Sequence, residues 1–417
     1  MRNARTFGLT VLLGLASACG SPDQAPPGAS DDLPISDAGR RDSGGKIRAD
    51  SALDLDARPM GDAMSPSLGE LLILDVPNTP CIPSQAPAVP LSEGAATASG
   101  FEKMGQLGDR RFAFGAEGSV VITFGFDGAS PSPPLLGALA VAAQNGALET
   151  LVAQGDGLGL QFYDAQGMAQ GSPVALAGSM AAGPSLGAGP TTSLAVWCTP
   201  DGVKGQLVDQ ARAPGPAVSF QSGSAGEGAC RTVTLWNGAN FTVVWTRLLH
   251  DTKTETSIAY VDLDGTIAFG KVLLLSSGAH QLVDLVRAPF GYVLLLNEGE
   301  RSGNPIALEL DDFGKIAPPA VRLQGSGAGF SVATFGSSFA IAALLTDGRA
   351  AMRPFDSSAR VLGPWVCVDD RPPDMPLAGK AALGTDDQGY AVAARMSDGS
   401  NWYMRTNSLG DRSPGGD

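Results

Sequence analysis

The pattern of apolar and polar residues repeats itself most clearly within Thr232–Gly314. The first copy has an apolar run at Leu235–Trp245, a polar loop, and a second apolar run at Ile258–Gly265. The second copy repeats this order with Ala288–Leu296 and Ile306–Gly314. In each copy a tight turn opens the first run and an Asp-x-x-Gly turn closes the second. Short apolar runs joined by a polar loop are typical of a β-hairpin, so the pattern predicts antiparallel strands.

The turn that closes the second strand recurs along the chain. Its Asp, replaced by Asn in the last copy, stands at Asp127, Asp164, Asp209, Asp262, Asp311, Asp356 and Asn407. Subtraction of these numbers gives intervals of 37, 45, 53, 49, 45 and 51 residues. A glycine that opens the preceding apolar strand accompanies the last six marks, at Gly146, Gly189, Gly238, Gly291, Gly336 and Gly389. The chain is therefore predicted to consist of repeated units of several short strands.

A period of about 45–50 residues with several strands per unit is typical of a β-propeller. Seven marks predict an all-β fold of seven blades, with six as the alternative if the first, degenerate unit is only half a blade. We expect the strand that begins near Leu71 to pair into the last blade and close the ring. The frequent Gly and Pro residues, 55 and 30 of 417, agree with many short strands and turns.

The N-terminus has the features of an export signal. Arg2 and Arg5 precede the short apolar run Phe7–Leu15, which small residues separate from Cys19. Leu-Ala-Ser-Ala-Cys resembles the lipobox of bacterial lipoproteins, although Leu15 lies four residues before the cysteine and the usual place is three. The resemblance implies a signal peptide at 1–18 and a lipid on Cys19; a plain cleaved signal is the alternative. Gly20 follows in place of the Asp that marks inner-membrane retention, so we expect an outer-membrane lipoprotein.

Residues 19–66 are predicted to be a disordered tether. Gly20–Pro66 contains nine Asp residues and no aromatic residue, and such a segment cannot bury enough apolar surface to offset its chain entropy. The Asp residues lack the spacing of a calcium loop. The propeller is then expected to span 67–410, followed by a disordered tail at 411–417.

The repeat also resembles one found in secreted proteins and lipoproteins of bacteria, especially myxobacteria. In that repeat a strand of the form aromatic-Gly-x-x-aromatic ending in Val-φ-Trp precedes a strand that ends in Asp-x-x-Gly. Trp236–Trp245 with Asp262–Gly265 matches this form well. The resemblance implies a propeller in an exported, anchored protein, and it implies no particular activity.

The five cysteines fit an oxidising compartment. Four remain after Cys19, and four cysteines allow three connectivities. Cys198 and Cys230 fall in neighbouring units, so a bridge between them is the expected one. Cys81 and Cys367 would then pair by elimination and tie the N-terminal arm to a late blade. No Cys-x-x-Cys motif is present for redox catalysis.

The other candidates for chemistry favour structural roles. His250 beside Asp251 and the isolated His280 are expected to be solvated loop residues. Gly183–Gly187 fits a Gly-x-Ser-x-Gly motif, but its Gly- and Ala-rich flanks predict a turn region that opens a blade. With only two histidines, we expect no metal site, no cofactor and no catalytic residue.

The repeated Asp and Trp residues are expected to serve the fold. Paired carboxylates such as Asp262 and Asp264 could bind calcium, but an Asp more often accepts hydrogen bonds from its own turn. Trp197 and Trp245 occupy equivalent strand ends, which favours packing between blades over a sugar-binding face.

The net charge of −14, without a cluster of Lys and Arg, excludes a nucleic-acid partner. We expect a monomeric lipid-anchored envelope protein, facing the periplasm or the cell surface, that presents a non-catalytic binding or scaffold module to a protein or glycan. The alternative is a glycan-directed hydrolase or lyase with channel carboxylates roughly 5–10 Å apart. A site should lie where the units differ, as in the loops Leu248–Thr256 and Asn297–Pro305.

Overall fold

The computed structural model describes residues 71–76, 89–92, 101–107, 109–115, 120–125, 135–144, 146–180, 182–222, 230–249, 253–277, 280–298, 304–324, 328–367, 379–385, 389–396 and 400–405. All of them belong to the compact unit Ala52–Asp417. They form strands and turns only, and no helical membrane crossing is found among them. The predicted signal peptide, tether and C-terminal tail lie outside the described residues.

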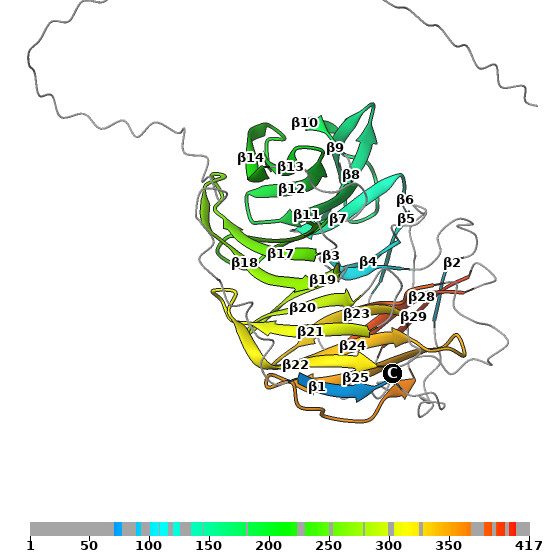
Figure 1. Ribbon diagram of the computed structural model, residues 1–417. Coiled ribbons are helices and arrows are strands. Elements are labelled where there is room, and N and C mark those ends of the chain that lie inside the picture. The colour runs from blue at the N-terminus through cyan, green and yellow to red at the C-terminus, as the bar shows by residue number, and fades with distance from the viewer. Residues whose placement is uncertain are drawn as a thin grey trace, which may run out of the picture. The chain divides into compact units, whose positions relative to one another are not determined.

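Seven antiparallel sheets, here called blades 1 to 7, follow one another along the chain (Figure 1). Blade 1 contains β3 (Lys103–Leu107), β4 (Arg110–Gly115), β5 (Val120–Gly125) and β6 (Leu135–Leu136). Blade 2 contains β7 (Ala138–Gln144), β8 (Ala147–Gln154), β9 (Gly157–Tyr163) and β10 (Val174–Ser179). Blade 3 contains β11 (Ala182–Ala188), β12 (Thr192–Thr199), β13 (Gly202–Asp209) and β14 (Pro214–Ser222). Blade 4 contains β15 (Arg231–Trp236), β16 (Phe241–Leu248), β17 (Lys253–Val261) and β18 (Ile267–Ser277).

The remaining blades include two strands from the N-terminal arm. Blade 5 contains β19 (His280–Ala288), β20 (Gly291–Glu298), β21 (Asn304–Leu310), β22 (Ile316–Gln324) and β1 (Leu71–Asp75). Blade 6 contains β23 (Ala328–Phe335), β24 (Ser338–Leu344), β25 (Ala350–Asp356) and β26 (Val366–Cys367). Blade 7 contains β27 (Ala382–Thr385), β28 (Tyr390–Arg395), β29 (Asn401–Arg405) and β2 (Val89–Ser92). The prediction of a seven-bladed all-β propeller is confirmed, and the six-bladed alternative is excluded.

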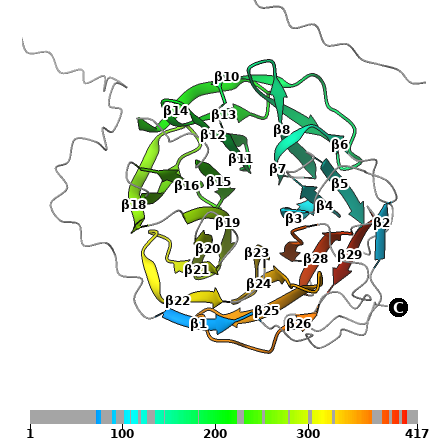
Figure 2. The same ribbon diagram turned by 45° about the vertical axis from the view of Figure 1, so that its right-hand side comes forward.

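The blades stand in a ring, with the first strand of each blade towards the centre (Figure 2). These innermost strands, β3, β7, β11, β15, β19, β23 and β27, contact one another in sequence, and β27 contacts β3 to complete the circle. Within each blade the chain then runs outward strand by strand, so neighbouring strands pair antiparallel through short turns.

An N-terminal strand closes the ring, but it is not the strand expected from the sequence. β1 pairs in parallel with the outer strand β22, with Leu71 opposite Ala320, and therefore adds a fifth strand to blade 5. The outer strand of blade 7 is β2, which pairs antiparallel with β29. The expectation that the Leu71 strand closes the last blade is wrong. β2 contains Pro90, and proline is tolerated on an edge strand because only one side must donate hydrogen bonds.

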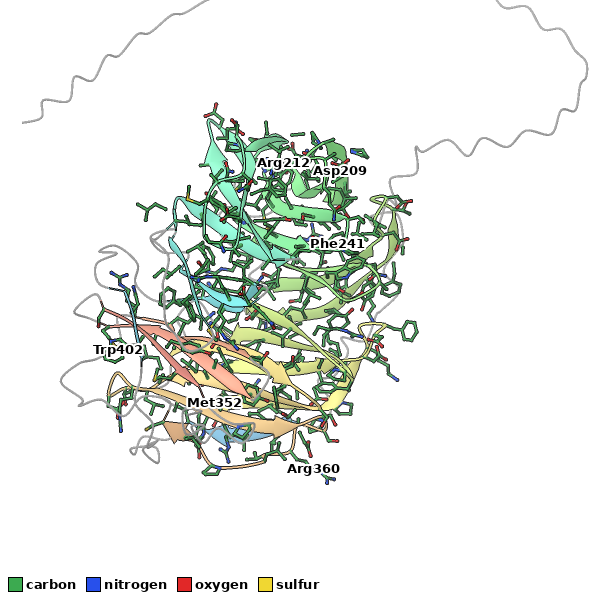
Figure 3. All side chains as sticks on the ribbon, turned by 180° about the vertical axis from the view of Figure 1, so that it is seen from behind. Asp209, Arg212, Phe241, Met352, Arg360 and Trp402 are labelled. Atoms are coloured by element: carbon green, nitrogen blue, oxygen red, sulfur yellow. A yellow bond between two sulfur atoms is a disulfide. The ribbon has the colours of Figure 1, made fainter. Side chains whose placement is uncertain are left out.

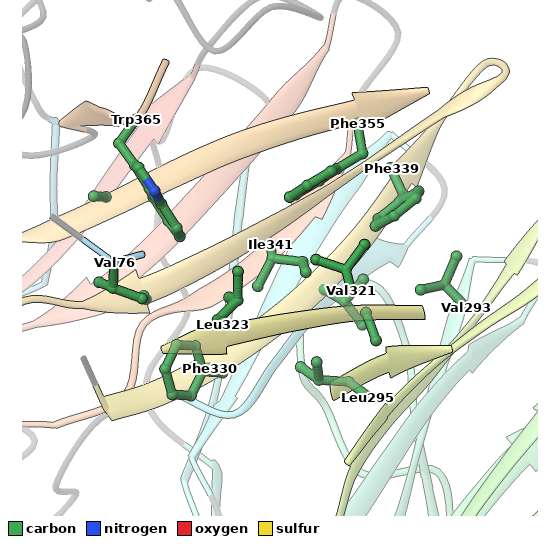
Figure 4. Close-up of a cluster of buried hydrophobic side chains, with 14 of the residues drawn as sticks. Val76, Val293, Leu295, Val321, Leu323, Phe330, Phe339, Ile341, Phe355 and Trp365 are labelled. Atoms are coloured by element: carbon green, nitrogen blue, oxygen red, sulfur yellow. The ribbon is translucent and has the colours of Figure 1, made fainter. Parts of the chain in front are cut away.

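The hydrophobic core consists of seven clusters, one between each pair of adjacent blades. Because successive side chains of a strand point to opposite faces, β20 sends Tyr292 and Leu294 toward blade 4 and Val293 and Leu295 toward blade 6. Figure 4 shows the cluster between blades 5 and 6, where Val293 and Leu295 lie with Phe339 of β24. Both faces of a blade are thus buried, which explains why the strands are continuously apolar.

Tryptophans and tyrosines join neighbouring blades. Trp197 belongs to the cluster between blades 2 and 3, and Trp245 to the cluster between blades 3 and 4. The expectation that both pack between blades is confirmed. The Tyr292 hydroxyl lies 2.8 Å from the Asn237 side-chain nitrogen, which donates to it, and 2.8 Å from the Thr242 hydroxyl of blade 4.

The repeated Asp side chains hold their own turns. The Asp311 carboxylate accepts hydrogen bonds from the N–H groups of Phe313 at 2.9 Å and Lys315 at 2.8 Å. The same arrangement recurs at the following marks, each with an Oδ1 that accepts main-chain N–H groups: Asp164, Asp209 and Asp356. The described residues contain no group of carboxylates, histidines and cysteines that could hold a metal ion. These observations support the structural reading of the Asp turns over calcium binding.

The predicted bridge between Cys198 and Cys230 is present, and it joins β12 of blade 3 to the residue before β15 of blade 4. Cys367 is also disulfide-bonded. Its pairing with Cys81 stays a prediction, because Cys81 lies outside the described residues. A bridge between neighbouring blades opposes their separation, typically by about 2–4 kcal/mol.

We expect Gly291→Ala to destabilise the fold much more than Gly238→Ala. Both glycines open the second strand of a blade with positive φ, 131° and 103°, a region that costs other residues about 1–2 kcal/mol. A Cβ on Gly238 meets nothing within 4 Å, whereas a Cβ on Gly291 overlaps the carbonyl oxygen of Leu310. Urea denaturation should show a loss of about 1–2 kcal/mol for Gly238→Ala and of about 3 kcal/mol or more for Gly291→Ala. Equal losses would show that the contact with β21 does not matter.

The stability of the propeller should fall as the pH rises from about 4.5 to 7, because of Glu309. Burial on β21 raises the pKa of this carboxyl from 4.5 to about 7, although the Ala359 N–H donates to it. The folded state therefore holds a proton that the unfolded chain releases, and the stabilisation present below pH 4.5 is lost above pH 7. Denaturant titrations should show a decrease on the order of 1 kcal/mol, reduced by solvent screening. Glu309→Gln should remove this part of the pH dependence, and an unchanged profile would contradict the assignment.

Candidate functional site

The central channel of the propeller contains a cavity of about 420 Å³. Its wall comes from the innermost strands β3, β7, β11, β15 and β19, together with Lys380, which precedes β27. The cavity is therefore built by six of the seven blades at the place where the ring is narrowest. A wall shared by so many blades is a rigid frame for a ligand, since each strand is held by its own sheet.

Charged side chains are concentrated in this wall. Lys103, Arg231 and Lys380 supply three positive charges, and Glu102 and Asp284 supply two negative charges. The wall of the cavity therefore has a net charge of +1, whereas the whole chain has a net charge of −14. The channel is thus locally cationic within an acidic protein.

Asp284 lies on β19 between the two lysines. Its carboxylate accepts a hydrogen bond of 2.9 Å from the N–H of Leu285. Burial raises the pKa of the Asp284 carboxyl, while the positive charges of Lys380 and Lys103 act in the opposite direction. Asp284 is half-buried and lines the cavity.

The two lysines are likewise half-buried. Burial lowers the pKa of the Lys103 ammonium, and the charge of Asp284 partly counters this effect. Its Nζ donates to the carbonyl of Val141 at 3.3 Å. Burial likewise lowers the pKa of Lys380, against the attraction of Asp284 and Glu102. Partly desolvated ammonium groups attract an entering anion more strongly than fully hydrated ones, because less water screens them.

The backbone of Lys380 is fixed at the junction of three blades. Its carbonyl accepts a hydrogen bond of 2.8 Å from the N–H of Phe101, next to blade 1. On the other side, a Cβ on Gly329 of β23 would lie only 2.9 Å from the Lys380 Cα, so the chains of blades 6 and 7 approach closely there. The Lys380 side chain is therefore positioned by the closure of the ring.

The opposite part of the wall carries hydroxyl groups and includes the Gly-x-Ser-x-Gly motif. Residues 183–187 lie within strand β11, and the expectation of a turn region that opens a blade is wrong. The Ser185 hydroxyl is buried and lies 2.7 Å from the hydroxyls of both Thr232 and Thr234 on β15. These hydroxyl contacts join blade 3 to blade 4, so Ser185 has a packing role between the two inner strands.

Of the histidines singled out in the sequence, His280 is described by the structure and does not line this cavity. His280 begins β19, where its Nε2 is 3.5 Å from a carboxylate oxygen of Glu298. His250 and Cys19 lie outside the described residues, as do the middles of the loops Leu248–Thr256 and Asn297–Pro305. The structure therefore points to the inner strands as a candidate site, whereas the sequence pointed to the hairpin loops.

Sequence reasoning missed the charged residues of the channel. One signal was available: Asp284 interrupts the apolar run Leu282–Val286, and a carboxylate in a buried strand needs a partner or a function. Its partners, Lys103 and Lys380, come from blades far away in the sequence. No local pattern could reveal that the three residues line one cavity.

No family model matches the sequence, and no curated protein matches it. Solved structures share its fold. Hydrazine synthase of Kuenenia stuttgartiensis is 11% identical, with a TM-score of 0.52, and the match covers 77% of this chain and 99% of that one. The Dos1 propeller is 10% identical, with a TM-score of 0.45 and coverage of 75% and 81%. A puromycin hydrolase is 16% identical, with a TM-score of 0.47; the match covers 82% of this chain and 56% of that chain. At such identities the likeness shows the propeller fold alone.

Proposed function

We propose that the chain is an exported, lipid-anchored envelope protein whose propeller is a non-catalytic binding module. The ligand is a small molecule or chain end with an anionic group, and it binds in the central channel. The observation that carries this proposal is the convergence of Lys103, Arg231 and Lys380 on one cavity. Ligand binding in the channel is a common use of propellers, because the ring places loops and inner strands from many blades around one axis.

The charge balance of the channel supports an anionic ligand. Burying an ammonium group costs free energy unless a negative charge pairs with it. The wall has three positive side chains and only two carboxylates, so one positive charge has no counterpart there. A carboxylate or phosphate that enters the cavity supplies the missing charge and accepts hydrogen bonds from the lysines. The neighbouring hydroxyl groups of Ser185 and Thr232 offer polar contacts at the opposite wall.

In this proposal the lipid anchor and the tether hold the binding module close to a membrane. A lipid on Cys19, followed by the segment 19–66 without aromatic residues, holds the propeller near the lipid surface with freedom to turn. The two disulfides agree with an oxidising compartment such as the periplasm or the cell surface.

We expect Lys380→Met to weaken the binding of anions about tenfold or more, because it removes a desolvated charge and keeps most of the side chain's volume. Calorimetric titration with succinate, glucuronate and inorganic phosphate measures this loss. Arg360→Met is the matched control, since Arg360 is exposed and does not line the cavity. Equal affinities of the two variants, or no binding of any of these anions to the natural chain, would contradict the proposal.

A glycan-directed hydrolase or lyase is the second candidate function. It is favoured by one observation: Asp284 and Glu102 line the same cavity, and burial raises the pKa of Asp284 as a general acid requires. Asp284→Asn separates the two functions. In an enzyme that uses Asp284 as its acid or base, the variant lowers the rate of alginate or pectate cleavage about 100-fold or more. In a binding module the same variant removes a repelling charge, so anions bind more tightly and no cleavage is seen in either form.

We expect Cys19→Ser to release the protein from the membrane fraction. The thioether-linked lipid needs the cysteine sulfur, and serine keeps the size of the side chain without it. Fractionation of a Gram-negative host that expresses the natural chain and the variant tests this. Cys81→Ser is a control for a general loss of cysteine, because Cys81 lies far beyond the signal. Unchanged membrane association of Cys19→Ser would remove the anchor.

A further inference from the structure

A second cavity, of about 320 Å³, lies between blades 2 and 3. Blade 2 contributes the turn between β7 and β8, Glu149 of β8 and the end of β9; blade 3 contributes the start of β12 and the turn after β13. This interblade cleft is separate from the channel, because the two cavities share no lining residue. Figure 3 shows Asp209 and Arg212 of its rim, joined by the 2.9 Å hydrogen bond that closes their turn.

The cleft is lined by buried polar atoms without partners. Glu149 is only 5% exposed, and the Ser193 hydroxyl donates to its carboxyl group. Its Oε2 has no hydrogen-bond partner among the described residues, and the same is true of Gln144 Nε2 and Thr192 Oγ1. An unpaired buried polar group costs about 1–3 kcal/mol, so three in one cavity indicate that something else fills their hydrogen bonds.

An aromatic ring and an arginine complete the wall. Phe162 of β9 faces blade 3, and the Arg212 guanidinium lies 5.1 Å from the centre of the Phe162 ring. Arg212 also donates to the carbonyl of Gln170. Its φ of 63° lies in the region where the equivalent turn after Asp164 has Gly167. A non-glycine residue there costs about 1–2 kcal/mol, which its contacts across the cleft offset.

We propose that the interblade cleft binds one sugar residue of a neutral glycan. Sugar hydroxyls both donate and accept, which matches an acceptor on Glu149, a donor on Gln144 and the hydroxyl of Thr192 in one cleft. An apolar sugar face suits the Phe162 ring beside them. An anion would be repelled by Glu149, and the described residues offer no metal-binding group. This site is independent of the anion site in the channel.

Saturation-transfer NMR at millimolar sugar concentrations measures binding to the natural chain. The sugars are methyl glucoside, methyl galactoside, methyl mannoside, N-acetylglucosamine and maltose. We expect at least one of these sugars to bind the natural chain. Glu149→Gln and Thr192→Val should each weaken that sugar about tenfold, the loss that corresponds to one hydrogen bond of about 1.4 kcal/mol. Both changes nearly keep the side-chain volume, and circular dichroism confirms that the variants are folded.

Two control variants make the result specific. Glu309→Gln changes another buried carboxyl with an unpaired oxygen that lines neither cavity, and it should leave sugar binding unchanged. Lys380→Met reports on the channel and should also leave sugar binding unchanged. Absence of binding by all five sugars would mean that only water occupies the cleft and would overturn the proposal. Binding that is lost in Lys380→Met but kept in Glu149→Gln would place the sugar in the channel and overturn it equally.

Discussion

The burial of both faces of every blade is the constraint on which the rest of the structure depends. A sheet with two apolar faces is stable only when a neighbour covers each face, and a row of such sheets leaves two faces bare. Closing the row into a ring removes both bare faces. The contact of β27 with β3 and the pairing of β2 with β29 complete this closure, so the stability of each blade depends on the first and last blades meeting.

Closure of the ring also brings together the charged residues of the central channel. The first strands of the blades converge around the axis, and residues distant in sequence come to line one cavity. Lys103 of blade 1, Asp284 of blade 5 and Lys380 beside blade 7 are partners there, and each charge is tuned mainly by burial and then by the others. The same rigid frame that stabilises the fold therefore holds these charges together around one cavity, which is the basis of the proposed anion site.

The repeated and the unrepeated residues have different tasks. The turn Asp residues, the strand-opening glycines and Trp197 and Trp245 recur at fixed places, and each serves local hydrogen bonding or packing between blades. The polar atoms of the two cavities occupy positions that differ from blade to blade. Asp284 interrupts the apolar run of an inner strand, and Arg212 stands where the turns after Asp164, Asp262 and Asp311 have glycine. Departures from the repeat coincide with the places where ligands can be held.

The sequence by itself determined the fold class, the seven blades, the role of the Asp turns and the Cys198–Cys230 bridge. These follow from interactions within one unit or between adjacent units, whose residues keep a regular spacing along the chain. It misassigned the closing strand, because Pro90 hides an edge strand and Leu71–Val76 looks the better candidate. It placed 183–187 in a turn, because small residues that allow β11 to approach β15 closely are also typical of turns. Only the tertiary structure decided which charges meet in the channel and which polar atoms are unpaired between blades 2 and 3, since those groups are brought together by the ring and not by any pattern along the chain.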